Sequence, residues 1–406
     1  MHPEAPLDPT PPRDRLGVLD VLRGVALFGI LAVNLSYWFR THPMVFLVHP
    51  DRWQGAADQG VDLLLMLLFN GRFLTLFSML FGVGLALQRE RVVAAGGRFY
   101  PLAARRLAVL FLIGVAHLVL LWMGDVLHLY ALFGPLLLFL LARTTRTLAI
   151  CTGLLVALPV LMSVWHLVTA SGGAPSAPPD MEVYRQQALE ALRVYGHGGF
   201  VEVTRYRITD YIQQIPTLAL IAHAVPLSFL VGVLVWRAGI VQEPQQHLKA
   251  LRRVARWGLA FAIAFSVAEM MLRPRQGQLS PLGRVLVEVM GSFGPAIVVL
   301  QALAYGAWVV LLHERVRVRP WLATIAAAGR MALTCYLLQS LICGLLFYGY
   351  GLGLYDRVSP GVGMLMVVAI YVAEVAFCNA WLRRYRFGPV EWVWRSLTYR
   401  QAQTML

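Results

Sequence analysis

The sequence predicts an all-α membrane protein, a polytopic bundle of about ten transmembrane helices. Three observations support this fold class: 58% of the 406 residues are hydrophobic, only 14% are charged, and the mean hydropathy is +0.64. A soluble globular chain averages about 25% charged residues, so this chain has too few to keep its surface in water. We therefore expect apolar side chains to face lipid, and we expect no large soluble domain.

Ten apolar segments are predicted to span the membrane, because each is close to or longer than the roughly 20 residues that a crossing needs. They are 17–38, 61–88, 103–122, 125–143, 147–168, 213–237, 251–272, 286–312, 329–350 and 361–382. The second segment is longer than a single crossing, and Asn70-Gly71 is expected to break it.

These segments divide the chain into five parts. They are a cytoplasmic segment (1–16), a first membrane half with spans one to five (17–168), an extracytoplasmic insert (169–212), a second membrane half (213–382) and a cytoplasmic tail (383–406). In the insert, MEVYRQQALEALRVYG has apolar residues at helical spacing and predicts an amphipathic helix on the outer face. The tail mixes Arg with Trp and Tyr, which favours the membrane interface.

Arginines gather in every second loop and set the expected orientation. They are Arg89, Arg91, Arg98, Arg105, Arg106, Arg143, Arg146, Arg237, Arg252, Arg253, Arg315, Arg317, Arg319, Arg383, Arg384 and Arg386. Because basic loops stay in the cytoplasm, both termini are predicted to be cytoplasmic, in the plasma membrane. The net charge of +14 then reflects topology and contact with membrane lipids, and nucleic acid is not an expected partner.

The sequence lacks the common motifs for metals, nucleotide phosphates and nucleophilic serines. The ten histidines show no HxxxH or HExxH spacing, and no GxxxxGK[ST] or GxSxG pattern occurs. The four cysteines (Cys151, Cys335, Cys343 and Cys378) lie in apolar segments and are expected to pack as small residues. No metal site is therefore predicted.

The first span, LDVLRGVALFGILAVNL, carries a line of polar residues. Asp20 and Arg23 are neighbours at i and i+3, and Asn34 follows Arg23 by eleven residues, about 16 Å along the same face of a helix. Such a line is expected to face protein or water rather than lipid. It predicts either a structural ion pair with an amide that binds a neighbouring helix, or a functional site.

Arg72 is the second unusual residue, because it lies well inside an apolar segment. An unpaired arginine at the centre of a span costs about 2.5–3.5 kcal/mol, so it needs an acid, carbonyl groups or a wet cavity. Glu269, Glu288 and Glu374 are the acids available to Arg72 or to Arg330. A snorkelling arginine beside a re-entrant turn is the alternative.

His117, Asp125 and His128 form the third group. Asp125 and His128 are at i and i+3 after a tight turn, and both are expected to face His117 in the preceding span. A carboxylate that orients an imidazole is what general-base chemistry needs. The simpler interpretation is that Asp125 caps the following helix and has no further role.

Four blocks of sequence resemble the YeiB-like membrane family, a group labelled as a domain of unknown function. They are LDVLRGVALFGILAVNL (19–35), GRFLTLFSMLFGVGLALQRERV (71–92), RRLAVLFLIGVAHLVLLWMGDVLHLYALFG (105–134) and GRMALTCYLLQSLICGLLFYGYGLGL (329–354) with FGPVEWVWRSLTY (387–399). The N-terminal half is in turn similar to integral-membrane acyltransferases such as heparan-alpha-glucosaminide N-acetyltransferase. Those proteins share the opening helix, with a polar residue eleven positions after its arginine.

That second resemblance implies an enzyme that moves an acyl group from cytosolic acyl-CoA to a hydroxyl or amine of an extracytoplasmic glycan or lipid. It assigns the CoA phosphates to Arg23 with its neighbour Asp20, and to Arg72, Arg105 and Arg106. It assigns the thioester oxyanion to Asn34. The base is then a histidine, with His42, His49 and His117, the last beside Asp125, as rival candidates.

Two other functions stay open at this stage. A transporter would use the intramembrane Arg72, Glu269, Glu288 and Glu374 as a substrate or proton path, although no internal repeat is evident. A non-catalytic scaffold would use the amphipathic helix and the aromatic tail as its working surfaces. The oligomeric state does not follow from the sequence.

Overall fold

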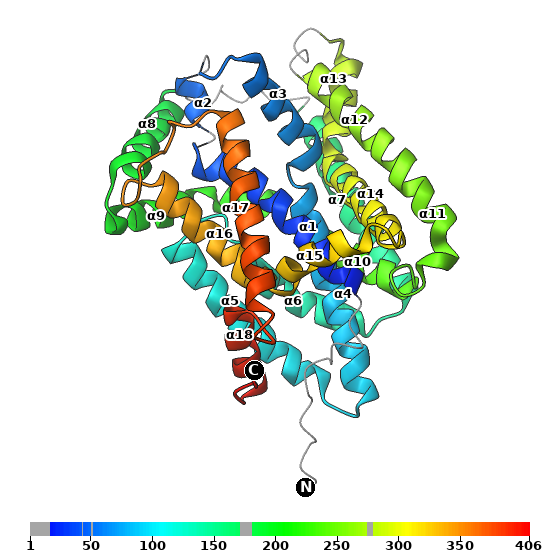
Figure 1. Ribbon diagram of the computed structural model, residues 1–406. Coiled ribbons are helices and arrows are strands. Elements are labelled where there is room, and N and C mark those ends of the chain that lie inside the picture. The colour runs from blue at the N-terminus through cyan, green and yellow to red at the C-terminus, as the bar shows by residue number, and fades with distance from the viewer. Residues whose placement is uncertain (1–16, 43, 50–51, 171–180, 274–278) are drawn as a thin grey trace.

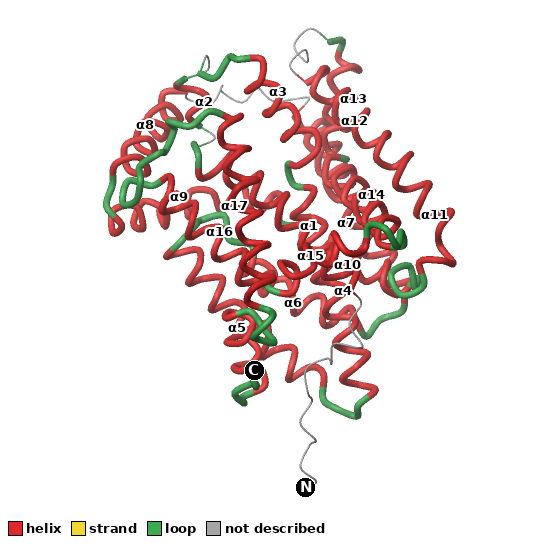
Figure 2. The backbone as a smooth tube through the Cα atoms, viewed as in Figure 1, coloured by secondary structure: helices red, strands yellow, loops and turns green. Residues whose placement is uncertain are grey.

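The computed structural model describes residues 17–42, 44–49, 52–170, 181–273 and 279–406, and these residues form helices and loops without a strand (Figure 2). The first half contains α1 (Gly17–Asn34), η2 (Leu35–Phe39), α2 (Val45–Val48), α3 (Ala56–Leu64), η3 (Leu65–Phe69), α4 (Arg72–Ala94), α5 (Phe99–Leu120), α6 (Leu127–Leu141) and α7 (Thr145–Ala170). The second half contains α8 (Met181–His197), α9 (Phe200–Ile221), α10 (Ala224–Arg237), η4 (Pro244–His247), α11 (Leu248–Arg253), η5 (Val254–Gly258), α12 (Leu259–Leu272), α13 (Pro281–Ser292), α14 (Gly294–His313), α15 (Arg319–Arg330), α16 (Ala332–Phe347), α17 (Pro360–Trp381) and α18 (Pro389–Tyr399).

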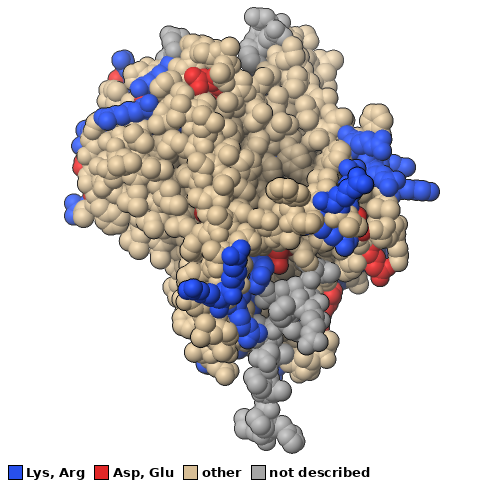
Figure 3. All heavy atoms as spheres, viewed as in Figure 1, with Lys and Arg blue, Asp and Glu red and all other residues tan. Residues whose placement is uncertain are grey.

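The chain is an all-α integral membrane protein. Seven helical stretches of the described residues are long and apolar enough to cross a membrane, and two bent helix pairs raise that number to nine. The pairs are α9 with α10 and α15 with α16, the second bent by 76°. The 15-residue α6 is also apolar, but it is shorter than these candidate spans. Figure 3 shows a broad surface largely without charged side chains, which separates the basic clusters on this face, as lipid contact requires.

Some predicted boundaries are confirmed and others are corrected. Asn70-Gly71 does break the second segment, with Gly71 at φ +78°, and the amphipathic helix of the insert is α8. The insert is shorter than predicted, because α9 begins at Phe200 and not at residue 213. Polar residues such as Arg207 and Asp210 lower the mean hydropathy of this helix, so a search for apolar segments does not find its first half. Both residues are nevertheless buried in the bundle. The predicted span 286–312 is divided at Phe293 into α13 and α14.

Helix α1 lies at the centre of the bundle, against α4, α14, α15, α16 and α17 (Figure 1). Its closest neighbour is α15, and glycines make this crossing possible. A Cβ atom on Gly24 would lie 2.5 Å from the carbonyl oxygen of Ile325, and one on Gly329 would lie 1.8 Å from that of Asp20. The two backbones are therefore in direct contact, as in other membrane helix pairs with small residues at the crossing.

Candidate functional site

The structure brings three polar side chains into a hydrogen-bonded chain at the end of α5. His117 Nδ1 lies 2.8 Å from Asp125 Oδ1, and His117 Nε2 lies 2.8 Å from Ser340 Oγ on α16. The carboxylate can only accept here, so Nδ1 carries the proton, and in the neutral imidazole Nε2 accepts from the serine hydroxyl. The carbonyl of Tyr336, at 3.3 Å, is the other acceptor within reach of that hydroxyl. The predicted contact between His117 and Asp125 is confirmed, and Ser340 completes the order hydroxyl, imidazole, carboxylate.

The chain continues from Asp125 to α9. The other carboxylate oxygen, Oδ2, lies 2.7 Å from His128 Nδ1 and accepts the His128 backbone N–H at 2.8 Å. His128 Nε2 then lies 2.8 Å from the hydroxyl of Tyr211. Asp125, one residue before the cap position Val126, thus accepts a backbone N–H in the first turn of α6 and is also the partner of two imidazoles. The two interpretations of this residue are compatible.

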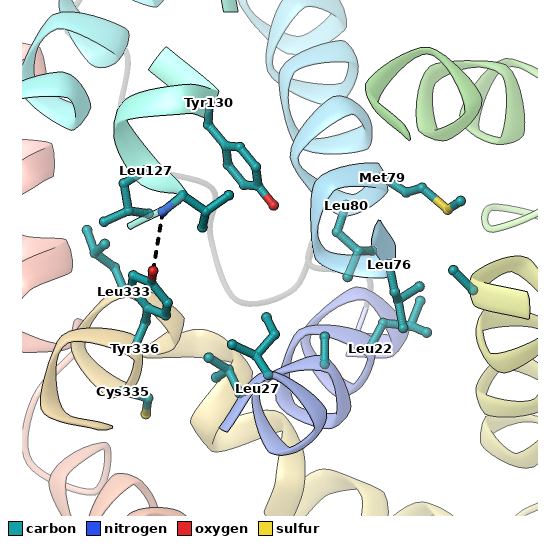
Figure 4. Packing of buried hydrophobic residues seen from close by; sticks show 14 of the residues in the cluster. Leu22, Leu27, Leu76, Met79, Leu80, Leu127, Tyr130, Leu333, Cys335 and Tyr336 are labelled. Atoms are coloured by element: carbon teal, nitrogen blue, oxygen red, sulfur yellow. Dashed lines mark hydrogen bonds between the residues drawn. The ribbon is translucent and has the colours of Figure 1, made fainter. Parts of the chain in front are cut away.

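Asp125 lies in the turn between α5 and α6, outside both helices. Burial alone would raise its pKa, but the hydrogen bonds from His117 and His128 outweigh burial and hold the pKa below its ordinary value. The turn is fixed against α16, because the backbone N–H of Val126 donates to the Tyr336 hydroxyl at 3.3 Å (Figure 4). The carboxylate is therefore charged and held in one orientation, as a residue that orients a base must be.

An apolar cavity of about 420 Å³ lies beside this chain, between α5, α16 and α18. It is lined by Ile113, Ala116, His117, Leu120, Leu121, Leu337, Pro389, Val390 and Val393. The His117 side chain itself is shielded from solvent, and Ser340 is only 2% exposed. The cavity therefore offers space for an apolar group one side-chain layer from the serine.

Three arginines gather near the N-terminal end of α5, about three turns from His117. Arg106 donates to Gln88 Oε1 at 2.9 Å and stacks on the ring of Trp394 at 4.4 Å. Arg395 of α18 and Arg23 of α1 lie within electrostatic range of it. Arg23 is partly held by Asp20, at 2.9 Å, so the predicted ion pair is confirmed. Arg105 is half-buried nearby on α5, and its Nε has no hydrogen-bond partner in the described chain.

The structure separates Arg72 from that group. Helices α1 and α4 are antiparallel: Gly29 of α1 faces Phe73, whereas Gly84, twelve residues after Arg72, is the neighbour of Arg23. Twelve residues are about 18 Å of helix, so Arg72 lies toward the Asn34 end of α1 and cannot share a phosphate group with Arg23. The predicted grouping of Arg72 with the other phosphate-binding arginines is corrected accordingly.

Arg72 is held by neutral groups and not by an acid. It donates to Gln301 Oε1 at 3.0 Å, to Ser266 Oγ at 3.4 Å and to the carbonyl of Asn70. The predicted acids have other environments: Glu269 pairs with Arg273 at 3.1 Å, Glu374 accepts from Gln339, and Glu288 and Arg330 are exposed. The carbonyl that Arg72 uses belongs to Asn70, directly after the π-helical η3. The η3 carbonyls of Leu67 and Leu68 accept instead from Gln301 and Tyr305.

The polar line on α1 is interrupted in the middle. Leu27 and Ile30, which lie on that face between Arg23 and Asn34, are 0% and 4% exposed and pack in the hydrophobic core (Figure 4 shows Leu27). A continuous wet path along α1 is therefore not formed. Asn34 is half-buried, and its amide makes no hydrogen bond within the described residues. Its assignment to an oxyanion stays a prediction.

The other two candidate histidines have different environments. His49 is exposed. His42 is buried, with Nε2 3.6 Å from Asp210 Oδ2 on α9, and it accepts the backbone N–H of Met44. Of these three candidates, only His117 has a carboxylate on one nitrogen and a hydroxyl on the other. His128 has the same arrangement, between Asp125 and the Tyr211 hydroxyl.

A second buried polar group lies next to the chain on α9, and the sequence did not predict it. Arg207 is 0% exposed and donates to the carbonyl of Val119, two residues beyond His117. Its Nε and Nη2 atoms have no hydrogen-bond partner among the described residues. Asp210 accepts from Tyr195 and Gln214. Arg207, Asp210 and Tyr211 were overlooked because their segment was read as a polar insert.

Ser340 and Arg395 were also missed, and no sequence signal identifies them. Ser340 lies in LLQSLICG without a glycine-flanked turn, and 223 residues separate it from His117. No set of three or more His, Cys, Asp or Glu side chains in the described chain is placed to hold a metal ion.

Fold and site together define a polytopic helical membrane protein with a buried polar chain that joins α5, α6, α9 and α16. YxaH of Bacillus subtilis (strain 168) is 35% identical over 411 residues, 97% of this chain and 96% of its own. YeiB of Escherichia coli (strain K12) is 32% identical over 409 residues, 96% of this chain and 97% of its own. Both are described as uncharacterized proteins.

Residues 235–401 match the family described as protein of unknown function (DUF418). The chain belongs to this family, which includes the YeiB-like proteins that the sequence blocks resemble. No solved structure matches the chain.

Proposed function

We propose that this protein is a membrane acyltransferase that moves an acyl group from cytosolic acyl-CoA to a hydroxyl or amine on the opposite side of the membrane. The observation that carries the proposal is the Ser340–His117–Asp125 chain, with both imidazole contacts at 2.8 Å. A hydroxyl, a base and a carboxylate in this order are the parts of a nucleophile activated for acyl transfer.

The reaction proceeds in two balanced steps. Ser340 Oγ attacks the thioester carbonyl carbon as its proton passes to His117 Nε2. The carbon–sulfur bond breaks, the thiolate takes that proton, and an acyl ester of Ser340 remains. The acceptor then gives its proton to His117 and attacks the ester, and the serine oxygen recovers a proton from His117. Asp125 stabilises the imidazolium in both steps.

The arrangement of α5 fits the shape of the donor. Arg106 and His117 are eleven residues apart, about 16 Å and three turns on one face of the helix. Arg106, Arg395 and Arg23 provide positive charge for phosphates at one end, and the apolar cavity accommodates the acyl group at the other. This route replaces the path along α1 that Leu27 and Ile30 close.

The acceptor is assigned to the other end of the polar chain. Tyr211 links His128 to α9, where Asp210 and Arg207 supply buried polar groups for a glycan or lipid headgroup. In the proposed orientation, the arginine-rich loops and both termini are cytoplasmic, so α8 and α9 belong to the outer side.

The test is acyl-CoA turnover by the purified full-length protein, with release of free CoA and acylation of the protein followed by mass spectrometry. Ser340→Ala should abolish the acylated peptide and lower turnover at least about 10²-fold, because the nucleophile is lost. Ser228→Ala is the matched control. Ser228 is equally buried but bonds only to the carbonyl of Ala224 in its own helix, so turnover should be unchanged.

Two outcomes contradict the proposal. One is a folded wild-type protein that neither binds acyl-CoA nor releases CoA in the presence of hydroxyl and amine acceptors. The other is turnover that is the same in Ser340→Ala and in the wild type.

A further inference from the structure

A second cavity lies between the N-terminal end of the α11–η5–α12 span and the C-terminal end of α14, and it shares no lining residue with the cavity beside the Ser340 site. Its volume is about 330 Å³. Arg252 and Arg256 line it from one helix, and Arg315 lines it from just beyond α14. Arg252 and Arg256 lie in the N-terminal part of the Pro244–Leu272 span and Arg315 follows α14, so the cavity lies near a membrane boundary. Basic side chains gather around α11 at this edge of the molecule (Figures 1 and 3).

The side chains of the three arginines have no partner in the part of the chain that the structure describes. None of their guanidinium groups makes a hydrogen bond or an ion pair with another described residue. The one acid of the lining, Glu314, accepts from the amide of Gln245. The cavity therefore has a clear excess of positive charge, and its cationic donors are free to bind an anion.

The local backbone is shaped around this cavity. Residues Val254–Gly258 form a π-helical turn, and the carbonyl of Ala255 accepts from the Trp308 indole at 2.9 Å. The indole fixes the spacing of the two helices and forms part of the lining. π-Helical turns inside α-helices occur frequently at functional sites, because they expose carbonyl groups and widen the helix.

The surroundings are apolar on the side that continues into the span. Leu248, Leu311 and Leu312 complete the lining. Trp257, directly after Arg256, and Phe261, one turn further along the helix, are 73% and 56% exposed, as lipid-facing side chains are. A ligand of this cavity thus has an anionic end among the arginines and an apolar end along the helix.

We propose that this cavity is a binding site for the headgroup of an anionic phospholipid. Phosphate oxygens match the three guanidinium groups, and the acyl tails continue over the exposed aromatic side chains. Basic pockets between transmembrane helices are a known form of site for anionic lipid headgroups. A free phosphate would use the arginines but leave the apolar lining uncovered, so the lipid is the better match.

The test is native mass spectrometry of the full-length protein in detergent, after incubation with dioleoylphosphatidylglycerol or with dioleoylphosphatidylcholine. The wild type should retain the anionic lipid preferentially. Arg252→Gln/Arg256→Gln should lower the affinity for the anionic lipid about tenfold. Arg315→Gln should lower the affinity for the anionic lipid as well, because Arg315 lines the cavity from the segment just beyond α14.

The matched control is Lys249→Gln/Arg253→Gln, which removes two positive charges from the same stretch without touching the cavity lining. It should leave lipid retention unchanged. Equal losses in both double variants would mean a diffuse positive surface and would overturn the proposal, as would equal retention of the two lipids. Strong competition by glycerol 3-phosphate would also overturn it, because the tails would then contribute nothing.

Discussion

At the scale of single residues, Asp125 holds the candidate site together. Its two oxygens accept hydrogen bonds from two imidazoles and from one backbone N–H, and the carboxylate is buried. Hydrogen bonds to a buried charged group are stronger than neutral ones, and a buried base left without its carboxylate is poorly oriented. The same residue thus contributes to stability and to the proposed chemistry.

Asp125→Asn should therefore lower the free energy of unfolding by about 3 kcal/mol, measured by detergent or thermal unfolding with tryptophan fluorescence. Asp58→Asn is the control, because Asp58 is half-buried and accepts one backbone N–H, from Gly361. That change should cost less than about 1 kcal/mol. Equal effects of the two substitutions would mean that the chain around Asp125 is not formed.

The pH dependence of the same variant follows from the lowered pKa of Asp125. A depressed pKa in the folded protein means that the carboxylate stabilises the fold above its ordinary pKa, about 4. This contribution disappears as the pH falls through the lower folded value. The wild type should lose part of its stability advantage over Asp125→Asn below about pH 4. An advantage that is constant from pH 7 to pH 3 would contradict the assignment.

At the scale of the helix, the crossing of α1 and α15 depends on two glycines. The Cβ of an alanine at position 329 would lie 1.8 Å from a backbone oxygen of α1, and one at position 24 would lie 2.5 Å from one of α15. Backbone atoms cannot move aside as a side chain does, so the helices must separate.

Gly329→Ala and Gly24→Ala should each lower the free energy of unfolding by about 1–3 kcal/mol, the usual effect of overpacking. Gly153→Ala in α7 is the matched control, because nothing lies within 4 Å of its Cβ position. That change should be neutral or slightly stabilising, since alanine favours a helix. Both effects can be measured by thermal unfolding in detergent, and a neutral Gly329→Ala would contradict the close crossing.

The helices also show how far the sequence leads. Apolar length predicts the spans, and Asn70-Gly71 predicts a break, because both signals are local. The 76° bend at Met331 has no such signal. It is held by Glu391 of α18, whose carboxylate accepts the backbone N–H groups of Leu333 and Thr334 at the start of α16.

The candidate site shows the same limit. His117 and Asp125 were predicted together because eight residues and one turn separate them, whereas Ser340 joins them only through the packing of α16 against α5. Arg72 was grouped with the wrong arginines because residue type does not reveal which end of an antiparallel helix lies next to a given neighbour. A single sequence therefore does not determine which side chains of distant helices lie next to each other.

At the scale of the whole molecule, both described ends of the chain share one side. Helix α1 begins below the middle of the bundle, beside α10 and α15, and α18 ends at its lower end, whereas α8 lies near the opposite end (Figure 1). The proposed donor and acceptor sites need these two ends to face different compartments. The positive-inside rule predicts that the end with the termini is cytoplasmic.

This orientation can be tested with single cysteines and a membrane-impermeant maleimide on intact cells. Gln186→Cys on α8 should be labelled directly, because this position is exposed and lies on the outer side in the proposed orientation. Gln401→Cys, exposed after α18, should be labelled only once the membrane is permeabilised. Both variants carry Cys151→Ser, since Cys151 is the one half-buried native cysteine and the other three are buried. Labelling in the reverse order would place the arginine group outside, away from cytosolic acyl-CoA, and would exclude the proposed direction of acyl transfer.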